Sequence, residues 1–267
     1  MTFVDEILTE VRQEVAEPDY GTKLPTLPPR PRPSFKEAIE RGRGRGALVV
    51  EYKRVSPGQA VSELPVRPIE QFLGLTAPSA TAYSCLATEH RFRGSPSDVA
   101  HLARSTERPV LFKDFVIDPR QVDVAARTGA SALLLITRLP IWERNPKSLR
   151  SLAGLAHAQG LEVVLEFHHR SELSRATDVP ADVYGVNVRD LATLKIDRAT
   201  AETTLAEARA LGLHPLLGLS GVESPSDARR FWTAGADGIL VGTAVARAPD
   251  PSAFLASLRR PREDDPR

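Results

Sequence analysis

The chain has 267 residues, of which 42% are hydrophobic and 6% aromatic, so wholesale disorder is excluded. The 35 basic and 34 acidic side chains nearly cancel, which argues against a partner such as nucleic acid or an anionic membrane surface. A single cysteine, Cys85, excludes an intramolecular disulfide and a four-thiolate metal site. No apolar run approaches the ~20 residues of a membrane span. Because the N-terminus also lacks the apolar core of a signal peptide, we expect a cytoplasmic protein.

The N-terminal region is predicted to be a helical and proline-rich extension, residues 1–46. Its first ~17 residues predict a helix with one apolar face. This face comprises Phe3, Ile7, Leu8, Val11 and Val15. Five prolines in Leu24–Pro33 exclude a helix or a central strand, so this segment is predicted to be an extended connector. Ser34 is the expected N-cap of a short helix ending near Arg41, with Glu37 at the capping-box position, and the RGRGRG run that follows is predicted to be a solvated turn.

Eight short apolar runs follow, and most lack the polar alternation of a strand with one solvated face. They are Ala47–Glu51, Ala82–Leu86, Pro109–Phe112, Ala132–Ile136, Val163–Glu166, Val183–Val186, Pro215–Leu219 and Gly238–Val241. Helical segments separate the runs, and those at 119–129 and 224–235 have proline at the start and glycine at the end. This alternation predicts a (β/α)8 TIM barrel over residues 47–260, followed by a flexible tail, 261–267. An open doubly wound sheet is the alternative, weakened because no G-x-G-x-x-G follows the first run.

Polar residues end six of the eight predicted strands, at the rim where barrel enzymes place their active sites. They include Glu51 and Lys53, Lys113, Glu166, Asn187 and Arg189, Ser220 and Gly221, and Gly242 and Thr243. Glu51 and Lys53 are two residues apart, so both side chains point to one face. Two lysines facing two glutamates, with Lys113 and Glu166 from across the barrel, separate the pKa values of these groups, which favours acid–base catalysis. A Schiff-base lysine is a competing use of the same residue type.

The last two predicted strands end in small residues, which are typical of a phosphate site. Glycine lets the backbone approach a ligand closely, and backbone N–H groups near a helix N-terminus favour an anion. Ser220-Gly221 and Gly242-Thr243 therefore predict a phosphate-binding end of the site. His168 and His169 are adjacent and point to opposite faces of an extended chain, so no shared metal ion is predicted.

Several blocks of the sequence resemble the indole-3-glycerol phosphate synthase family. In chain order they are VVEYKRVSP, LFKDFVIDPRQV, LEFHHRSEL, GVNVRDL, LSGVESPSDA and ADGILVGTAV, with TEHRFRGS and SFKEAI as further matches. The resemblance covers residues 34–258. It implies a carboxy-lyase of tryptophan biosynthesis that converts 1-(2-carboxyphenylamino)-1-deoxyribulose 5-phosphate into indole-3-glycerol phosphate without a cofactor or metal. It also implies a monomer whose partner is this phosphorylated small molecule, and leaves contacts with other pathway enzymes open.

The resemblance also implies a role for each catalytic position. Lys113 is the general acid that protonates the ketose carbonyl oxygen, and Glu166 is the general base. Lys53 holds the substrate carboxylate or supplies the proton for dehydration. Glu51 and Asn187 orient these groups and the substrate hydroxyls.

The substrate-binding positions follow from the same resemblance. Phe92 and Arg189 fall near the anthranilate end, and Ser56 falls on the mobile loop after the first strand. The implied phosphate ligands are Ser220, Gly221, Gly242 and Thr243. The chain departs from the family pattern where Ser56-Pro57-Gly58 replaces Ser-Pro-Ser, and where GLTAPSATAYSCL leads into the second strand.

A third departure is Leu219, which replaces the glutamate of the family's Glu-Ser-Gly. Restoring the carboxylate by Leu219→Glu is expected to raise turnover or broaden the alkaline limb of the rate profile, unless the neighbouring residues have adapted to leucine. Three alternative functions stay open: a paralogue acting on a substituted anthranilate-derived substrate in secondary metabolism, a Schiff-base aldolase, and a non-catalytic barrel subunit. Phosphoribosylanthranilate isomerase is disfavoured, because Cys85 lies inside the second strand without a matching acid.

Overall fold

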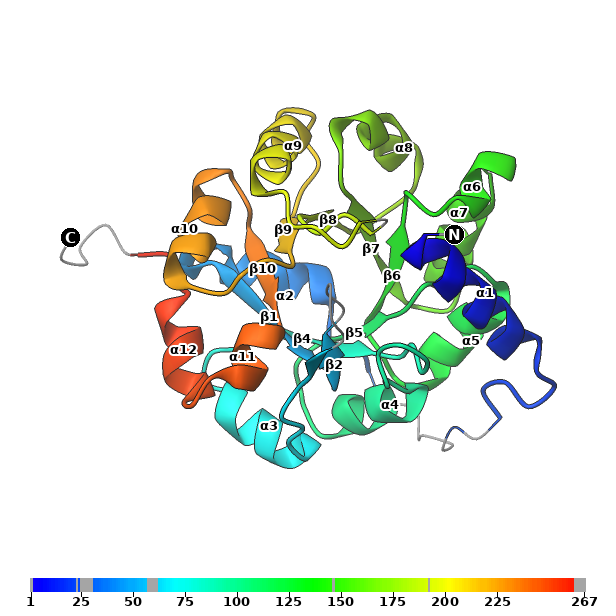
Figure 1. Ribbon diagram of the computed structural model, residues 1–267, viewed down its shortest axis with the longest axis horizontal. Coiled ribbons are helices and arrows are strands. Elements are labelled where there is room, and N and C mark those ends of the chain that lie inside the picture. Colours follow the sequence, from blue (N-terminus) through cyan, green and yellow to red (C-terminus); the bar gives the residue numbers. More distant parts are fainter. Residues whose placement is uncertain are drawn as a thin grey trace.

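The computed structural model describes residues 2–22, 24, 31–56, 62–145, 147–191 and 193–261. Eight parallel strands close into a barrel in the order β1-β10-β9-β8-β7-β6-β5-β4 (Figure 1). Their bounds are β1 (Ala47–Tyr52), β4 (Ala82–Leu86), β5 (Val110–Lys113), β6 (Ala132–Ile136), β7 (Glu162–Phe167), β8 (Val183–Asn187), β9 (Leu216–Leu219) and β10 (Gly238–Val241). The predicted TIM barrel is confirmed, and every predicted strand agrees with the observed one to within one residue at each end.

The strands are buried on both faces, as their nearly continuous apolar sequences require. All six residues of β1 are buried. Closure of the barrel rests on this strand, because Val49 pairs with Ala82 of β4 and Ala47 pairs with Gly238 of β10. All the strands run parallel, so their carboxyl ends meet on one face of the barrel.

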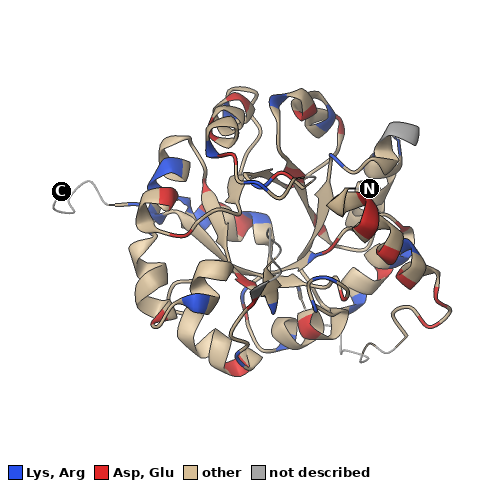
Figure 2. Ribbon diagram, in the orientation of Figure 1, with Lys and Arg blue, Asp and Glu red and all other residues tan. Residues whose placement is uncertain are grey.

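Helices surround the barrel, and basic and acidic residues are interspersed along them (Figure 2). They are α1 (Phe3–Ala16), α2 (Phe35–Gly42), η1 (Arg43–Arg45), α3 (Ile69–Thr76), α4 (Pro96–Arg104), α5 (Pro119–Arg127), α6 (Ile141–Arg144), α7 (Lys147–Ala158), η2 (Arg170–Glu172), α8 (Leu173–Asp178), α9 (Arg198–Ala210), α10 (Pro225–Thr233), α11 (Thr243–Arg247) and α12 (Pro251–Ser257). The Ser224 hydroxyl accepts a hydrogen bond from the Asp227 N–H, which confirms the predicted cap of α10. Within the described ranges, no helix is both long and apolar enough to cross a membrane.

The N-terminal extension contributes one helix to the carboxyl-end face of the barrel. Ile7, Leu8, Val11 and Val15 are buried as predicted, while Phe3 is only partly buried. Phe3 lies edge-on to Phe92, with ring centroids 6.4 Å apart. A basic side chain of the β4–α4 loop, Arg91, pairs with Glu6 at 2.7 Å and Glu10 at 3.2 Å. These contacts hold α1 beside the end of β4.

The rest of the extension agrees with its predicted outline where it is described. Ser34 caps α2 by accepting a hydrogen bond from the Glu37 N–H, and its hydroxyl donates to Glu162. The RGRGRG run forms the end of α2 and the single turn η1. Most of the proline-rich connector, residues 25–30, lies outside the described residues, as does the tail beyond Pro261.

A short antiparallel hairpin, β2 (Val55–Ser56) with β3 (Ser62–Glu63), follows β1. The sequence did not predict it, since two-residue strands carry no readable period. Ser56, in the first strand of this hairpin, is buried and only 8% exposed. Pro57 and Gly58, where the sequence departs from the family pattern, lie outside the described residues. The hairpin places Ser56 over the carboxyl-end face.

Candidate active site

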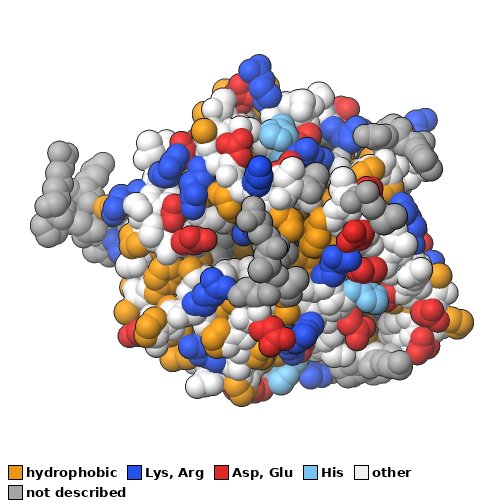
Figure 3. All heavy atoms as spheres, viewed as in Figure 1, with side chains coloured by type: hydrophobic (Ala, Val, Ile, Leu, Met, Phe, Trp, Pro, Cys, Tyr) orange, Lys and Arg blue, Asp and Glu red, His pale blue; other side chains and the backbone are white. Residues whose placement is uncertain are grey.

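A cavity of about 250 Å³ opens at the carboxyl ends of the strands, on the face of the molecule that Figure 3 shows. Every predicted site residue except Glu51 lines it. These residues are Lys53, Ser56, Phe92, Lys113, Glu166, Asn187, Arg189, Ser220, Gly221, Gly242 and Thr243. They come from segments up to 190 residues apart in the chain, from Lys53 to Thr243, and the barrel brings them together.

Two lysines share one buried carboxylate at one side of the cavity. Lys53 Nζ lies 2.9 Å from Glu51 Oε1, and Lys113 Nζ lies 3.9 Å from Glu51 Oε2. Burial of Glu51 would raise the pKa of its carboxyl, but the two ammonium groups outweigh burial and hold that pKa below its ordinary value. Glu51 therefore stays ionised and fixes both lysine side chains. This geometry agrees with the predicted inward Glu-Lys pair.

The second carboxylate, Glu166 at the end of β7, has a different environment. It is 1% exposed, and its Oε1 accepts a hydrogen bond of 2.9 Å from Asn187 Nδ2. Its Oε2 has no hydrogen-bond partner among the described residues. A buried carboxylate oxygen without a partner is costly unless a ligand completes it. Glu166 thus offers the cavity an acceptor for a proton.

Two aromatic rings and one guanidinium also line the cavity, the rings following β4 and β5 and the guanidinium following β8. The Phe92 and Phe115 rings lie 6.1 Å apart, and both line the cavity. Arg189 Nη1 donates to the Leu194 carbonyl at 3.1 Å. Burial lowers the pKa of Arg189, although the charges of Glu223 and Glu51 oppose this effect. An aromatic ring that carries a carboxylate fits between these groups, since the phenyl rings offer it an apolar surface and the guanidinium offers its carboxylate a positive charge.

The phosphate end is built from the ends of β9 and β10. Ser220 and Gly221 have φ values of 66° and 70°, so two consecutive left-handed residues follow β9. Such a conformation costs a non-glycine residue about 1–3 kcal/mol and is common at ligand sites. The hydroxyls of Ser56 and Thr243 share a hydrogen bond of 2.9 Å, which joins the hairpin to the start of α11. These groups surround one end of the cavity.

Gly242 is constrained by its neighbours. A Cβ at this position would lie 2.9 Å from Glu51 Oε1 and 3.0 Å from Glu51 Cβ. We expect Gly242→Ala to cost about 1–3 kcal/mol of unfolding free energy by overpacking. It should also lower kcat/KM roughly ten- to a hundredfold, because displaced reacting groups lose catalysis steeply. Thermal unfolding and steady-state kinetics measure the two effects.

The matched control is Gly154→Ala in α7, where an added Cβ meets nothing within 4 Å. It should leave kcat/KM unchanged and raise the unfolding free energy by about 0.5–1 kcal/mol, because alanine favours a helix over glycine. Equal activity of the two alanine variants would show that the contact between Gly242 and Glu51 does not matter for the site.

Leu219 lies inside the barrel and does not belong to the cavity lining described above. It is 1% exposed, and an added Cβ at Gly185 would lie 2.6 Å from Leu219 Cδ1. Gly185 therefore makes room for the leucine side chain. This packing indicates that the neighbouring residues have adapted to leucine. It therefore speaks against the expectation that a glutamate at this position raises turnover.

We accordingly expect Leu219→Glu to lower the unfolding free energy without raising turnover, since it puts a carboxylate in the place of a buried, closely packed leucine. Leu219→Met is the control, because a volume-conserving apolar change costs less than about 1.5 kcal/mol. Thermal unfolding and a pH–rate profile of both variants decide the matter. A higher turnover or a broader alkaline limb in the glutamate variant would restore the sequence-based expectation.

The sequence reasoning missed several cavity residues. Thr88, Asp114, Phe115, Glu223 and Arg247 also line the cavity. Burial raises the pKa of Asp114, although hydrogen bonds from Thr88, the Phe115 N–H and Gln121 act against this. Asp114 directly follows Lys113 at the end of a predicted strand, and this position could have identified it as a cavity residue. Among the described residues, no group of three or more His, Cys, Asp or Glu is placed to hold a metal ion.

Comparisons with known proteins agree with this fold. A family model described as Indole-3-glycerol phosphate synthase matches residues 3–258. Indole-3-glycerol phosphate synthases of Staphylococcus aureus strains Newman and COL are each 36% identical over 263 residues, covering 97% of this chain and 98% of theirs. A 3-hexulose-6-phosphate synthase structure matches with a TM-score of 0.62 and 17% identity, over 79% of this chain and 97% of its own.

The tryptophan synthase alpha chain from Legionella pneumophila matches with a TM-score of 0.60 and 14% identity, over 83% of this chain and 94% of its own. At such identities these two structures show the shared barrel fold alone. The family match and the curated relatives extend over nearly the whole sequence. The chain therefore belongs to the indole-3-glycerol phosphate synthase family.

Proposed function

We propose that this protein is an indole-3-glycerol phosphate synthase and thus an enzyme of tryptophan biosynthesis, as its curated relatives are named. The observation that carries the proposal is that two ammonium groups and a separate buried carboxylate lie around one cavity. Glu51 holds two ammonium groups, those of Lys53 and Lys113, while Glu166 keeps one oxygen without a protein partner. One site thus contains acids and a separate base, as a sequence of proton transfers requires.

The substrate of this reaction is 1-(2-carboxyphenylamino)-1-deoxyribulose 5-phosphate. Its phosphate would bind at Ser220, Gly221, Gly242 and Thr243, with Ser56 beside them. Its anthranilate ring would lie between Phe92 and Arg189. This orientation would place the ketose carbonyl between those two ends, facing the side of the cavity where Lys53 and Lys113 lie.

Ring closure then needs an acid, which we assign to Lys113. As the ring carbon that bears the carboxylate attacks the ketose carbonyl, a new C–C bond forms and Lys113 protonates the carbonyl oxygen. Loss of carbon dioxide from the same ring carbon returns the bonding electron pair to the ring. The product of these steps is a five-membered ring that carries a hydroxyl group.

Dehydration completes the indole. The hydroxyl leaves as water after accepting a proton from Lys53, and the ring loses a proton to Glu166. Both residues line the cavity, and Asn187 holds Glu166 by the Oε1 hydrogen bond, which leaves Oε2 to accept this proton. Carbon dioxide and water account for all the atoms lost. The carboxy-lyase class follows from this sequence of steps.

The decisive experiment is the appearance of indole fluorescence when purified protein meets the carboxyphenylamino-deoxyribulose phosphate in the presence of a chelator. We expect turnover without added metal or nucleotide. Dependence on a divalent metal would contradict the proposal, and borohydride trapping of substrate on Lys53 or Lys113 would support a Schiff-base aldolase instead. Faster turnover of a ring-substituted substrate would indicate the paralogue of secondary metabolism.

A further inference from the structure

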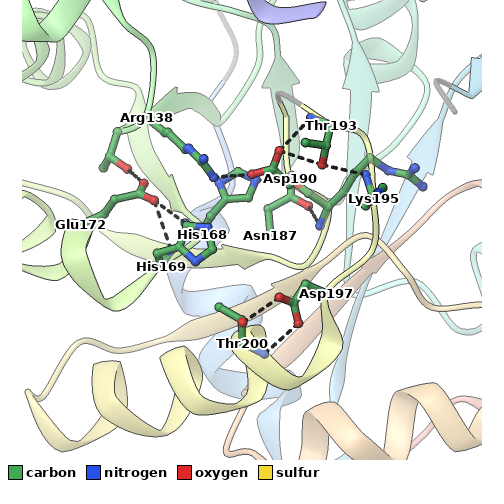
Figure 4. A network of polar contacts seen from close by, with 12 residues as sticks. Arg138, His168, His169, Glu172, Asn187, Asp190, Thr193, Lys195, Asp197 and Thr200 are labelled. Carbon is green, nitrogen blue, oxygen red and sulfur yellow. Dashed lines mark hydrogen bonds and ion pairs between the residues drawn. The ribbon is translucent and has the colours of Figure 1, made fainter. Parts of the chain in front are cut away.

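One buried histidine lies two residues from the proposed base, Glu166, and has no assigned role in the reaction. His168 follows β7 and is 3% exposed. Its Nε2 forms a hydrogen bond with the Arg189 carbonyl oxygen, and its Nδ1 has no hydrogen-bond partner among the described residues. A carbonyl oxygen can only accept, so Nε2 must carry a proton and donate it to this hydrogen bond. Figure 4 shows this histidine beside Asn187, between the ends of β7 and β8.

The backbone of His168 is held from two sides. Its N–H donates to Glu172 Oε1 at 3.3 Å, and its carbonyl accepts a hydrogen bond of 3.4 Å from Thr204 Oγ1. The neighbouring His169 N–H donates to the same Glu172 oxygen at 3.1 Å. The backbone that carries the imidazole ring is therefore fixed. The hydrogen bond of the ring can then position the Arg189 carbonyl.

The hydrogen bond of His168 closes a ring of contacts around the proposed base. Glu166 Oε1 accepts from Asn187 Nδ2 at 2.9 Å, and Asn187 Oδ1 accepts from the Arg189 N–H at 3.0 Å. The carbonyl of Arg189 then bonds to His168, which is two residues from Glu166 along the chain. Both backbone polar groups of Arg189 thus form hydrogen bonds with side chains at the ends of β7 and β8.

This ring determines how the Asn187 amide is turned. Because the Arg189 N–H requires an oxygen, the amide nitrogen faces Glu166 and donates to Oε1. If the backbone of Arg189 shifted, the amide could rotate and present its oxygen to the carboxylate. The donor to Glu166 would then be lost, and the Arg189 guanidinium would move from the cavity wall.

We propose that His168 is a positioning residue for the ring-closure reaction, which holds Arg189 and, through Asn187, orients Glu166. The inference rests on the proposed function. It assigns to His168 no contact with substrate and no proton transfer. Loss of the His168 donor should therefore affect both kinetic constants. It should raise KM because Arg189 is displaced, and lower kcat because Glu166 is no longer oriented.

The test compares two substitutions of His168. In His168→Phe a ring of similar size remains and the donor is lost, whereas His168→Gln can place an amide N–H near the original Nε2. We expect the phenylalanine variant to lose about tenfold or more in kcat/KM, with KM raised and kcat lowered together. The glutamine variant should stay within about threefold of wild type. His169→Phe is the matched control and should keep wild-type kinetics.

A second measurement does not depend on activity. Nitrogen chemical shifts of the wild-type imidazole should show a proton on Nε2. A bare Nε2 would overturn the proposal, as would full activity of His168→Phe or equal losses in the phenylalanine and glutamine variants. If wild type shows the proton on Nε2 but no indole fluorescence from the carboxyphenylamino-deoxyribulose phosphate, the proposed function fails while the hydrogen bond from His168 to Arg189 stands.

Discussion

Replacing Lys113 with alanine should lower turnover at least about a hundredfold, which is the smaller end of what a placed general acid contributes. The Lys113 ammonium enters the cavity from the end of β5 and lies 3.9 Å from Glu51. The other lysine, Lys53, is in contact with the opposite oxygen of that carboxylate, so it is not free to take the same place. Steady-state fluorescence with saturating substrate measures the loss.

The control for this variant is Lys147→Ala. Lys147 begins α7 and is exposed on the outside of the barrel, so its removal changes net charge equally without touching the site. Turnover of Lys147→Ala should match wild type. Near wild-type turnover in Lys113→Ala, with normal thermal unfolding, would move the acid role to Lys53.

Glu166→Gln should have a comparable effect, again at least about a hundredfold on turnover. Glutamine keeps an oxygen that can accept from Asn187 Nδ2, so the side chain can keep its position. The free Oε2 becomes an amide nitrogen that cannot take a proton. We therefore expect the loss in kcat with little change in KM, as befits an interaction needed only in the transition state.

A second carboxylate serves as the control for Glu166. Glu202 lies on α9 and pairs with Arg230 on the surface, so Glu202→Gln should leave kcat unchanged. A raised KM with normal kcat in Glu166→Gln would indicate that Glu166 binds substrate and does not act as the base.

The helix boundaries illustrate what local sequence can predict. Ser224 before Pro225 and Gly235 after the apolar face mark the start and end of α10, because capping groups act on N–H and carbonyl groups a few residues away. The strands were likewise predicted from short apolar runs. The period of two residues also places Glu51 and Lys53 on one face, and the structure joins them at 2.9 Å.

The hairpin after β1 and the environment of Leu219 needed the tertiary structure. The strands β2 and β3 are two residues each, too short for a periodic signal. Leu219 fits because Gly185 of the adjacent strand leaves space for it, and this pairing depends on the register of β8 against β9. Register is a property of two segments together, so neither segment shows it alone.

The sequence by itself therefore determined the order of strands and helices, the family, and the polar residues at the strand ends. Only the tertiary structure decided which of these residues share partners: Glu51 contacts both lysines, while Glu166 keeps one free oxygen and bonds to Asn187. The physical reason is distance along the chain. Propensities, caps and alternation act over a few residues, whereas hydrogen bonds and ion pairs in the cavity join strand ends whose separation is set by closure of the barrel.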